Sequence, residues 1–442
     1  MGTTWWSQTQ TYAINTKDIT IFSSFPLPVS ICPRTPSGHS PYPRLGGKSA
    51  VILFVVTLVA FVVESQLTQY VQSTLHFRQP FFLFYVVHSS FALTFPLHLL
   101  YLVLTTSASL ESILAGLSLA VKIHFAPSDQ SPVATLRSPF PYVLLFRLSA
   151  FLTLGLTLPS LLWFVSVSLS PLSDVTAIWN TNAFFAYIIT VRLFKLNWEL
   201  RKLVAVLVAT FGVLAVVYGD AKQPEPPIDH RKDLELRTET DKPKAPLVGD
   251  LLTLFASIGY GLYQVMYKRY AALPSDPEFD TGSTYIPLPG SDGIPAGELS
   301  EDDMKLDDSV YPPSFGLHPN LLACGIGLMT LLSLWIMLPL LHYSGYERFR
   351  LPDSPIAVLS IAGIAGSGLV FNAGILTLLG IWGPIVVSVG NLLTIVLVLL
   401  SDVTVGQGMD VITPWNLAGS GGIVVAFGIL AYDMVQHPRS HN

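Results

Sequence analysis

Hydrophobic side chains along this chain gather into ten continuous blocks, and polar side chains fill the stretches between them. A helix that crosses the hydrocarbon core of a bilayer needs about 20 predominantly apolar residues. Each block has roughly that length and therefore predicts one membrane-spanning helix. The blocks are Ser49–Val71, Pro80–Leu104, Val143–Leu169, Ser173–Val191, Leu203–Tyr218, Leu247–Tyr267, Leu321–Leu341, Ser354–Leu379, Pro384–Leu400 and Trp415–Tyr432.

The blocks are continuous apolar runs, whereas the strands of a transmembrane barrel alternate apolar and polar residues. Inside lipid the backbone must bond to itself, which leaves helices once the barrel is excluded. Composition agrees, because 51% of the residues are hydrophobic and only 12% are charged, against about 25% charged in soluble domains. The predicted fold class is therefore all-α, a polytopic membrane protein with about ten transmembrane helices.

The polar stretches divide the chain into five parts. Residues 1–47 are rich in Pro, Ser and Thr and are predicted to form a disordered cytosolic tail. The first transmembrane half, 48–270, holds six helices, and the second, 319–433, holds four. Between them, 271–318 carries ten acidic residues and predicts a disordered acidic loop. Residues 434–442 form a short cytosolic tail.

The block count also predicts a duplication. The fourth and fifth blocks carry Asn182 and Phe211-Gly212, and the ninth and tenth carry Asn391 and Phe427-Gly428 in the same order. Two units of five helices have opposite orientation in the membrane, because five is odd. Inverted repeats are typical of carriers, whose site lies at mid-membrane between the repeats. In the connector after the second block, residues 110–121 predict an interfacial helix.

Lysine and arginine placement predicts the orientation, because these residues are enriched in cytoplasmic loops. Fourteen of them flank the blocks on the side of the two chain ends, and nine flank the opposite side. Both termini are therefore predicted to be cytosolic. The basic segment 220–246 lies on the opposite side and argues against this orientation. The membrane itself is left open between an endomembrane, such as Golgi or vacuole, and the plasma membrane.

Glu64 lies well inside the first block, where a charge costs about 2.5–3.5 kcal/mol on insertion scales. Such a carboxylate should face a cavity or a partner, or be protonated, and Gln66 extends the polar stretch. The alternative is that Glu64 lies near the headgroups and is simply hydrated. The only basic residue well inside a block is Arg147, whose side chain is expected to reach the interface.

Two further groups are candidates for the solute site. The fourth block carries Trp179 and Asn182 at mid-depth, and the ninth carries Ser388 and Asn391 at the matching place. These residues either line a cavity or join helices by hydrogen bonds.

The sixth block carries Tyr260, Tyr263 and Tyr267 on one helix face, together with Gln264. The tyrosines either form an aromatic wall for a ring-shaped solute or belong to an interfacial belt, since Lys268 marks the membrane edge.

No acid–base pair, nucleophile arrangement, metal motif or phosphate loop stands out, so the sequence predicts a protein that is not an enzyme and needs no cofactor. The two cysteines, Cys32 and Cys324, indicate no disulfide framework. Expected partners are a small-molecule solute and the lipid bilayer, with no nucleic acid, and with a homodimer as one arrangement.

Taken in order, several short segments resemble the drug/metabolite transporter superfamily (EamA-like). The chain is most similar to the F branch of the solute-carrier family that includes the nucleotide-sugar transporters, some of whose members are linked to thiamine. The segments that carry the likeness are Ser65-Gln66, Pro80–Leu83, Phe95–Leu97, Ser173–Ala177, Asn182, Arg201–Leu203, Tyr218–Asp220, Leu262-Tyr263, Lys268, Phe371-Asn372, Pro384, Ser388 and Gly390.

The resemblance implies ten helices in two inverted repeats, a central cavity and cytosolic termini. It also adds Asn372 to the candidate site. Two positions depart from the family pattern, which has a lysine after the fourth-helix Asn and another beside the sixth-helix Tyr. This chain has Ala183 and Gln264 there.

The predicted function is secondary transport of a small organic solute by alternating access. Because a diphosphate needs fixed positive charge at mid-depth, the solute is expected to be cationic, zwitterionic or neutral, with a thiamine-like compound as one candidate. The alternative is a membrane sensor or scaffold that keeps the transporter fold without transporting, its acidic loop docking partners.

Overall fold

The computed structural model describes residues 47–126 except 107, then 135, 138–167, 169–170, 172–220, 246–273, 313–401, 403 and 413–436. Within these ranges the regular structure is entirely helical, which confirms the all-α class. Most of the predicted N-terminal tail, acidic loop and C-terminal tail lies outside the described residues.

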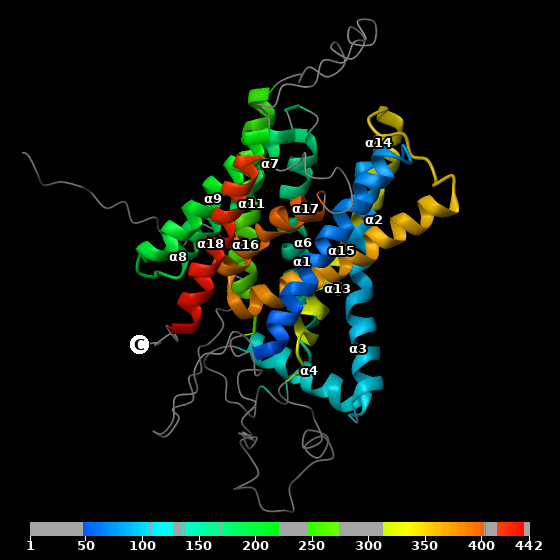
Figure 1. Cartoon of the computed structure of the whole chain (residues 1–442). Helices are drawn as coiled ribbons and strands as arrows, with labels where there is room; N and C mark the ends of the chain where they lie inside the picture. The colour runs from blue at the N-terminus through cyan, green and yellow to red at the C-terminus, as the bar shows by residue number, and fades with distance from the viewer. Residues whose placement is uncertain are drawn as a thin grey trace, which may run out of the picture.

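Ten helical spans follow the ten apolar blocks in order, with ends within a few residues of those predicted (Figure 1). Four of the ten spans are interrupted and consist of two α-helices, which in two of these spans are separated by a 3₁₀ turn. The spans are α1 (Gly47–Ser73); α2 (Pro80–Ser90), η1 (Phe91–Leu93) and α3 (Thr94–Thr105); α6 (Tyr142–Val167); α7 (Leu172–Asn180) and α8 (Asn182–Leu193); α9 (Leu200–Asp220); α11 (Pro246–Tyr270); α13 (Leu317–Ser333), η3 (Leu334–Ile336) and α14 (Met337–Ser344); α15 (Pro355–Trp382); α16 (Pro384–Asn391) and α17 (Leu393–Ser401); and α18 (Pro414–Gln436).

Eight of the ten spans are long and apolar enough to cross a membrane by length and composition. The other two are the α7–α8 pair, which is interrupted, and α11, whose hydropathy is lowered by its tyrosines and by Gln264. Both carry predicted site residues. The chain is thus a polytopic α-helical membrane protein.

The interrupted spans occur in matching pairs, because the second and seventh spans each contain a 3₁₀ turn. Each turn is followed by a proline three residues after its end, Pro96 or Pro339. A proline lacks an N–H and leaves the carbonyl four residues earlier without its helical donor. For Pro96 that carbonyl belongs to Ala92, and the Cys324 thiol donates to it across 3.1 Å.

Helix packing follows the same duplication. If each span is exchanged with the span five places along, the α1–α15 contact becomes the α11–α6 contact, and both are extensive. The α9–α18 and α8–α16 contacts map onto themselves under the exchange. This pattern agrees with two five-helix repeats related by a pseudo-twofold axis, as the block count predicted.

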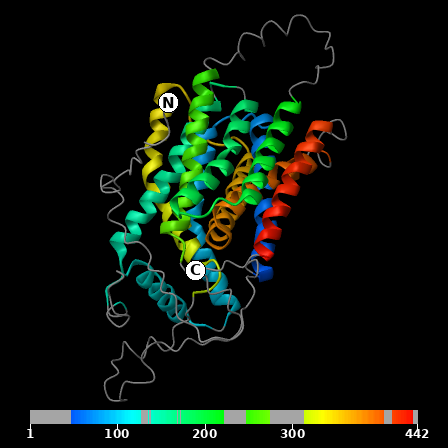
Figure 2. The same ribbon diagram turned by 90° about the vertical axis from the view of Figure 1, so that its left-hand side faces the viewer.

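Helices α9 and α18 pack side by side (Figures 1 and 2). Their close approach requires glycine on both helices. A Cβ atom on Gly212 would lie 2.7 Å from the Gly419 carbonyl oxygen, and one on Gly419 would lie 2.4 Å from the Gly212 oxygen. The sequence repeat had aligned Gly212 with Gly428 instead. A Cβ on Gly428 would meet nothing within 4 Å, so these two glycines have different environments.

The connector after the second span forms α4 (Leu110–Phe125), which crosses the lower end of the bundle in Figure 1. Ser109 caps it by accepting a hydrogen bond from the Ser112 backbone N–H. Its inner face is buried through residues including Leu117 and Val121. The prediction of a helix at 110–121 is confirmed.

Candidate functional site

The fourth span is broken at mid-depth by polar residues. The backbone N–H of Thr181 bonds to Ile178 O at 3.1 Å, a 3₁₀ turn in place of an α-helical bond. The Asn182 side chain then donates to Trp179 O at 2.8 Å, and Thr181 Oγ1 lies 3.0 Å from Ser257 Oγ on α11. Asn182 therefore bonds within the break, and Thr181 joins the break to α11.

The ninth span is broken at the equivalent place. The N–H of Leu392 bonds to Val389 O at 3.1 Å, and Thr394 Oγ1 donates to Asn391 O at 2.6 Å. The Asn391 side-chain oxygen is buried and has no hydrogen-bond partner in the described part of the chain. A buried amide oxygen in that condition is costly and calls for an explanation, and a solute donor would satisfy it.

Next to the first break, four aromatic rings form a continuous stack that we call the aromatic column, made of Trp163, Trp179, Tyr260 and Tyr263. Trp179 stacks on Tyr260 with ring centroids 5.1 Å apart and an interplanar angle of 30°. Trp163 meets Trp179 edge-on at 6.5 Å, and Tyr260 lies 6.0 Å from Tyr263. These separations fall within the range of attractive aromatic pairs.

The aromatic column connects the two repeats, because its tryptophans lie on the third and fourth spans and its tyrosines lie on the sixth. Gln264 extends the column within the second repeat. The Gln264 side chain hydrogen-bonds Tyr260 and accepts a hydrogen bond from Ser388 on α16. Tyr263 is buried, and its hydroxyl has no hydrogen-bond partner among the described residues. A path of aromatic and neutral polar groups therefore runs from α6 and α7 across α11 to α16.

Two other predicted residues meet at the α1–α15 contact. A Cβ on Gly368 would lie 3.0 Å from Glu64 Oε1, so the Glu64 carboxylate rests directly on this glycine. Asn372 donates to Gly368 O at 2.9 Å, and Phe61 packs against Phe371 with centroids 4.9 Å apart. Glu64 Oε2 is buried without a hydrogen-bond partner in the described residues.

The pseudo-twofold axis relates this contact to the aromatic column. At the equivalent contact, Tyr263 of α11 rests on Gly155 of α6, where an added Cβ would lie 3.1 Å from the Tyr263 ring. Glu64 and Tyr263 thus occupy equivalent positions. Each is the residue that meets a glycine of the antiparallel neighbour.

Four of the predicted residues differ in how far they are buried. Glu64 is half-buried, and one of its carboxylate oxygens is buried. Tyr267 is fully buried and belongs to no exposed interfacial belt. Arg147 is exposed at the start of α6, as expected for a side chain that reaches the interface. Gln66 is half-buried on α1, away from the aromatic column.

Trp163 is the one column residue that the sequence did not single out. It lies on α6, and its membership depends on how α6 packs against α7 and α11, which no local pattern reveals. A tryptophan near Pro159 in a long apolar block was the available signal. Among the described residues, no group of three His, Cys, Asp or Glu side chains is placed to hold a metal ion.

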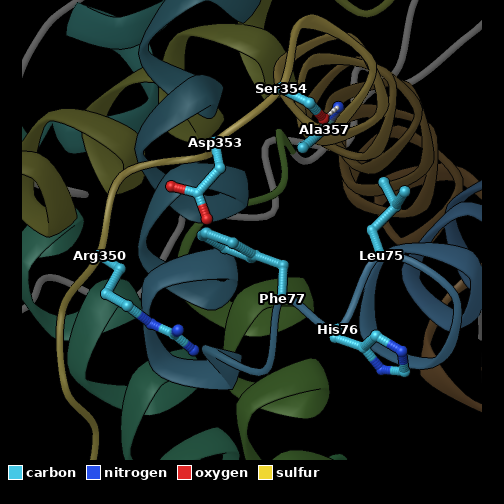
Figure 3. A pocket seen from close by; sticks show the side chains of 7 residues that line it. All are labelled: Leu75, His76, Phe77, Arg350, Asp353, Ser354 and Ala357. Carbon is cyan, nitrogen blue, oxygen red and sulfur yellow. Dashed lines mark hydrogen bonds between the residues drawn. The ribbon is translucent and has the colours of Figure 1, made fainter.

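The two described pockets lie at the ends of the bundle, away from the column. The larger, about 80 Å³, opens between the end of α1 and the start of α15 and is lined by residues that include Phe77, Arg350 and Asp353 (Figure 3). The smaller, about 10 Å³, lies beside Tyr267 and Gly380 at the other end.

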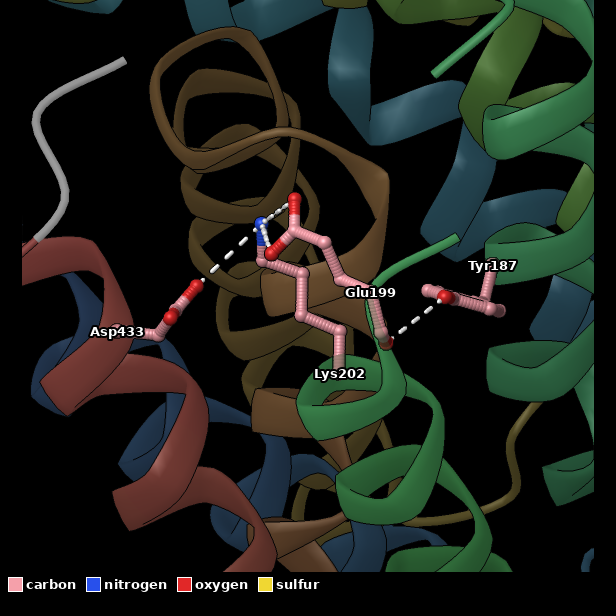
Figure 4. Close-up of polar contacts among 4 residues, drawn as sticks. All are labelled: Tyr187, Glu199, Lys202 and Asp433. Atoms are coloured by element: carbon pink, nitrogen blue, oxygen red, sulfur yellow. Dashed lines mark hydrogen bonds and ion pairs between the residues drawn. The ribbon is translucent and has the colours of Figure 1, made fainter. Parts of the chain in front are cut away.

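Polar contacts hold both ends of the bundle together. At the end where α1 begins, Lys202 lies 2.7 Å from Glu199 and 3.3 Å from Asp433, which joins α9 to α18 (Figure 4). At the opposite end, Glu347 accepts hydrogen bonds from the N–H groups of Phe81 and Phe82, each at 2.9 Å, and so caps α2. Polar contacts thus join α9 to α18 at one end and the α14–α15 turn to α2 at the other.

Comparison with known proteins points to transport. The chain is 25% identical over 396 residues to the thiamine-repressible mitochondrial transport protein of Saccharomyces cerevisiae, covering 85% of this chain and 90% of that protein. It is 26% identical over 267 residues to an uncharacterized transporter of Schizosaccharomyces pombe, covering 58% of this chain and 62% of that protein. No family model matches the chain.

One solved structure, described only as a crystal structure of a protein, aligns with a TM-score of 0.43 and 13% identity over 88% of this chain and 98% of that one. That likeness is too weak to carry an argument. The two transporter relatives and the polytopic helical fold together support a membrane transporter.

Proposed function

We propose that this chain is a secondary transporter that carries a small, ring-bearing organic solute at the aromatic column. The observation that carries the proposal is the column itself, in which two tryptophans of the first repeat, on α6 and α7, contact two tyrosines of the second repeat, on α11. Gln264 and Ser388 extend it to α16. Carriers built from inverted repeats bind their solutes at such a junction, beside broken helices. The repeats would rock about this site.

The chemistry of the column favours an uncharged, zwitterionic or cationic solute. Aromatic faces hold flat rings by stacking and attract cations through the ring quadrupole. The polar groups beside them are a neutral amide and a hydroxyl, Gln264 and Ser388. Ala183 is fully buried where the related transporters are expected to have a lysine. A diphosphate would lack the fixed positive charge that it needs.

The alternative, a sensor or scaffold that does not transport, would leave the column without a ligand. Buried polar atoms at the Tyr263 hydroxyl and the Asn391 side-chain oxygen argue against that alternative, since neither has a protein partner in the described residues. Such atoms are better explained by a solute or water that visits them. Both curated relatives also carry transporter names.

Thermal unfolding of the purified protein with added compounds tests the proposal, because a ligand of the folded state raises the apparent Tm. The panel consists of thiamine as a cationic ring compound, tryptophan as a zwitterion and UDP-glucose as a diphosphate. We expect stabilisation by one of the first two classes and none by UDP-glucose. The shift should be lost in Trp179→Ala and Tyr260→Ala.

Trp198→Ala is the matched control, because Trp198 is 54% exposed at the turn between α8 and α9 and lies outside the column. This variant should keep the ligand-induced shift. Stabilisation by UDP-glucose, or a shift that survives in Trp179→Ala, would contradict the proposal.

A further inference from the structure

Glu64 is the one acidic side chain of α1, and it lies within the bundle with no ion pair in the described part of the chain. One carboxylate oxygen is buried without a hydrogen-bond partner. The other faces Gly368, where a Cβ would lie 3.0 Å from Oε1 and 2.6 Å from a Val87 methyl carbon. The absence of a side chain at Gly368 is what makes room for the carboxyl group.

The helices around Glu64 supply no positive charge to balance it. Neither α15 nor α17, which both pack on α1, contains a titratable or charged residue. On α2, which provides Val87, the titratable groups are Tyr85 and His88. His88 is already bonded through Nδ1 to Phe84 O at 3.0 Å. The remaining charge on α1 is Lys48, sixteen positions earlier in the sequence.

An unpaired carboxylate in an apolar environment is strongly disfavoured, because burial removes its hydration without replacing it. The neutral acid avoids that cost. The same carboxyl group would ionise readily once water reached it. Glu64 is therefore suited to bind a proton when the α1–α15 contact is closed and to release it when that contact opens to water.

The two repeats carry different residues at the position of Glu64. The equivalent position on the other repeat is Tyr263, whose phenol stays uncharged at ordinary pH. The pseudo-twofold axis thus pairs a carboxyl group with a phenol. Of the two equivalent positions, only the one beside the α1–α15 contact carries a carboxyl group, and it lies apart from the aromatic column.

We propose that the Glu64 carboxyl group is a proton-binding site that couples proton movement to solute transport. In each cycle an O–H bond forms between a carboxylate oxygen and a proton taken from water on one side of the membrane. That bond breaks on the other side and the proton returns to water, so one proton crosses and no other bond changes. Coupling to solute rests on the proposed function, whereas proton binding does not.

Infrared spectroscopy of the purified protein in lipid tests proton binding directly, without any solute. A protonated buried carboxyl group gives a C=O band that shifts in D₂O, and we expect wild type to show one that disappears on titration between about pH 5 and pH 9. Glu64→Gln should lack this band, and Glu64→Asp should keep a shifted one. Identical spectra for wild type and Glu64→Gln would overturn the proposal.

Glu347→Gln is the matched control, because Glu347 is held as an acceptor by two backbone N–H groups at the end of the bundle. It should leave the band unchanged. Gel filtration and thermal unfolding of each variant establish that the protein is folded, and a band that persists in folded Glu64→Gln would also overturn the proposal.

Coupling is measured in proteoliposomes with radiolabelled thiamine. One pH unit should drive about ten-fold accumulation of solute per coupled proton, with a gradient of one sign and not the other. Glu64→Gln should exchange labelled for unlabelled thiamine yet lose gradient-driven accumulation. If Glu64→Gln still accumulates thiamine ten-fold, the proposal is wrong. If wild type moves neither thiamine nor radiolabelled tryptophan, the proposed solute class fails while the infrared result stands.

Discussion

At the scale of single residues, the charged groups Glu347 and Lys202 at the ends of the bundle have partners, whereas three polar groups of the proposed sites leave an atom without one in the described part of the chain. Glu347 at one end accepts two backbone hydrogen bonds, and Lys202 at the other lies between two carboxylates. Inside, Glu64, Tyr263 and Asn391 each leave a buried polar atom without a partner among the described residues. Buried polar groups usually have partners, and we assign the free atoms of these three residues to a ligand or a proton because they lie at the proposed sites.

Gly368 is predicted to be essential for the packing of the Glu64 carboxyl group between α1 and α15. In Gly368→Ala the new methyl group would lie 2.6 Å from a Val87 methyl carbon and 3.0 Å from Glu64 Oε1, and overpacking of this kind costs about 1–3 kcal/mol. Gly366→Ala is the control, because a Cβ there meets nothing within 4 Å. A fall in Tm confined to Gly368→Ala is expected, and equal Tm values for the two variants would contradict the packing.

The buried imidazole of His124 on α4 should make the free energy of unfolding fall in acid. Burial lowers the pKa of its imidazole below the ordinary value of 6.5, with the hydrogen bond to Tyr270 O acting in the opposite direction. The unfolded chain then binds the proton more readily than the folded one. Stability should be complete above pH 6.5 and fall as pH drops below it, by up to about 1.4 kcal/mol per unit for this group.

Denaturant unfolding between about pH 7.5 and pH 5 measures this dependence, and His124→Gln should flatten it. The His318 ring faces His124 at 6.0 Å, so part of the slope will remain in the variant. A slope unchanged by the substitution would show that His124 does not take part.

At the scale of helices, block boundaries were predictable to within a few residues because lipid allows only one backbone solution. The interruptions were not predicted, although Pro96 and Pro339 were visible signals for two of them. The breaks at Thr181 and Leu392 have no proline and depend on side-chain bonds such as Asn182 to Trp179 O. Trp163 was missed because its role arises from packing between distant helices.

The α9–α18 crossing is predicted to tolerate no side chain at Gly419. A Cβ there would lie 2.4 Å from the Gly212 carbonyl oxygen, which is backbone and cannot move aside without separating the helices. Gly421→Ala on the same helix is the control, since a Cβ at Gly421 meets nothing within 4 Å. We expect Gly419→Ala to lower the Tm and the yield of folded protein, with Gly421→Ala close to wild type.

At the scale of the whole molecule, polar contacts join neighbouring helix ends on each face of the bundle. Arg269 at the end of α11 donates to Leu193 O at the end of α8, and Lys202 joins the start of α9 to the end of α18. On the other face, Gln79 and Arg350 exchange two hydrogen bonds between the α1–α2 and α14–α15 turns.

The predicted topology places Ser300 and Tyr346 on opposite sides of the membrane. Cysteines introduced at these two positions, in a chain whose Cys32 and Cys324 are replaced by serine, should therefore be labelled from opposite sides. Ser300→Cys, in the acidic stretch between α11 and α13, should react only from the cytosol, because the basic residues favour that face. Tyr346→Cys, at a position 89% exposed on the other face, should react only from the opposite side. Labelling of both positions from one side would contradict the predicted topology.

The central claim is that this chain moves a small organic solute at the aromatic column. The most direct measurement is uptake of radiolabelled compounds into proteoliposomes that contain wild type, Trp179→Ala or the control Trp198→Ala. We predict saturable uptake of a ring-bearing cation or zwitterion by wild type and by Trp198→Ala, and no uptake of UDP-glucose. Uptake by Trp179→Ala should be at least about ten-fold slower, which corresponds to a loss of about 1.4 kcal/mol of transition-state stabilisation. Saturable uptake of UDP-glucose, or equal rates for the two tryptophan variants, would contradict the account.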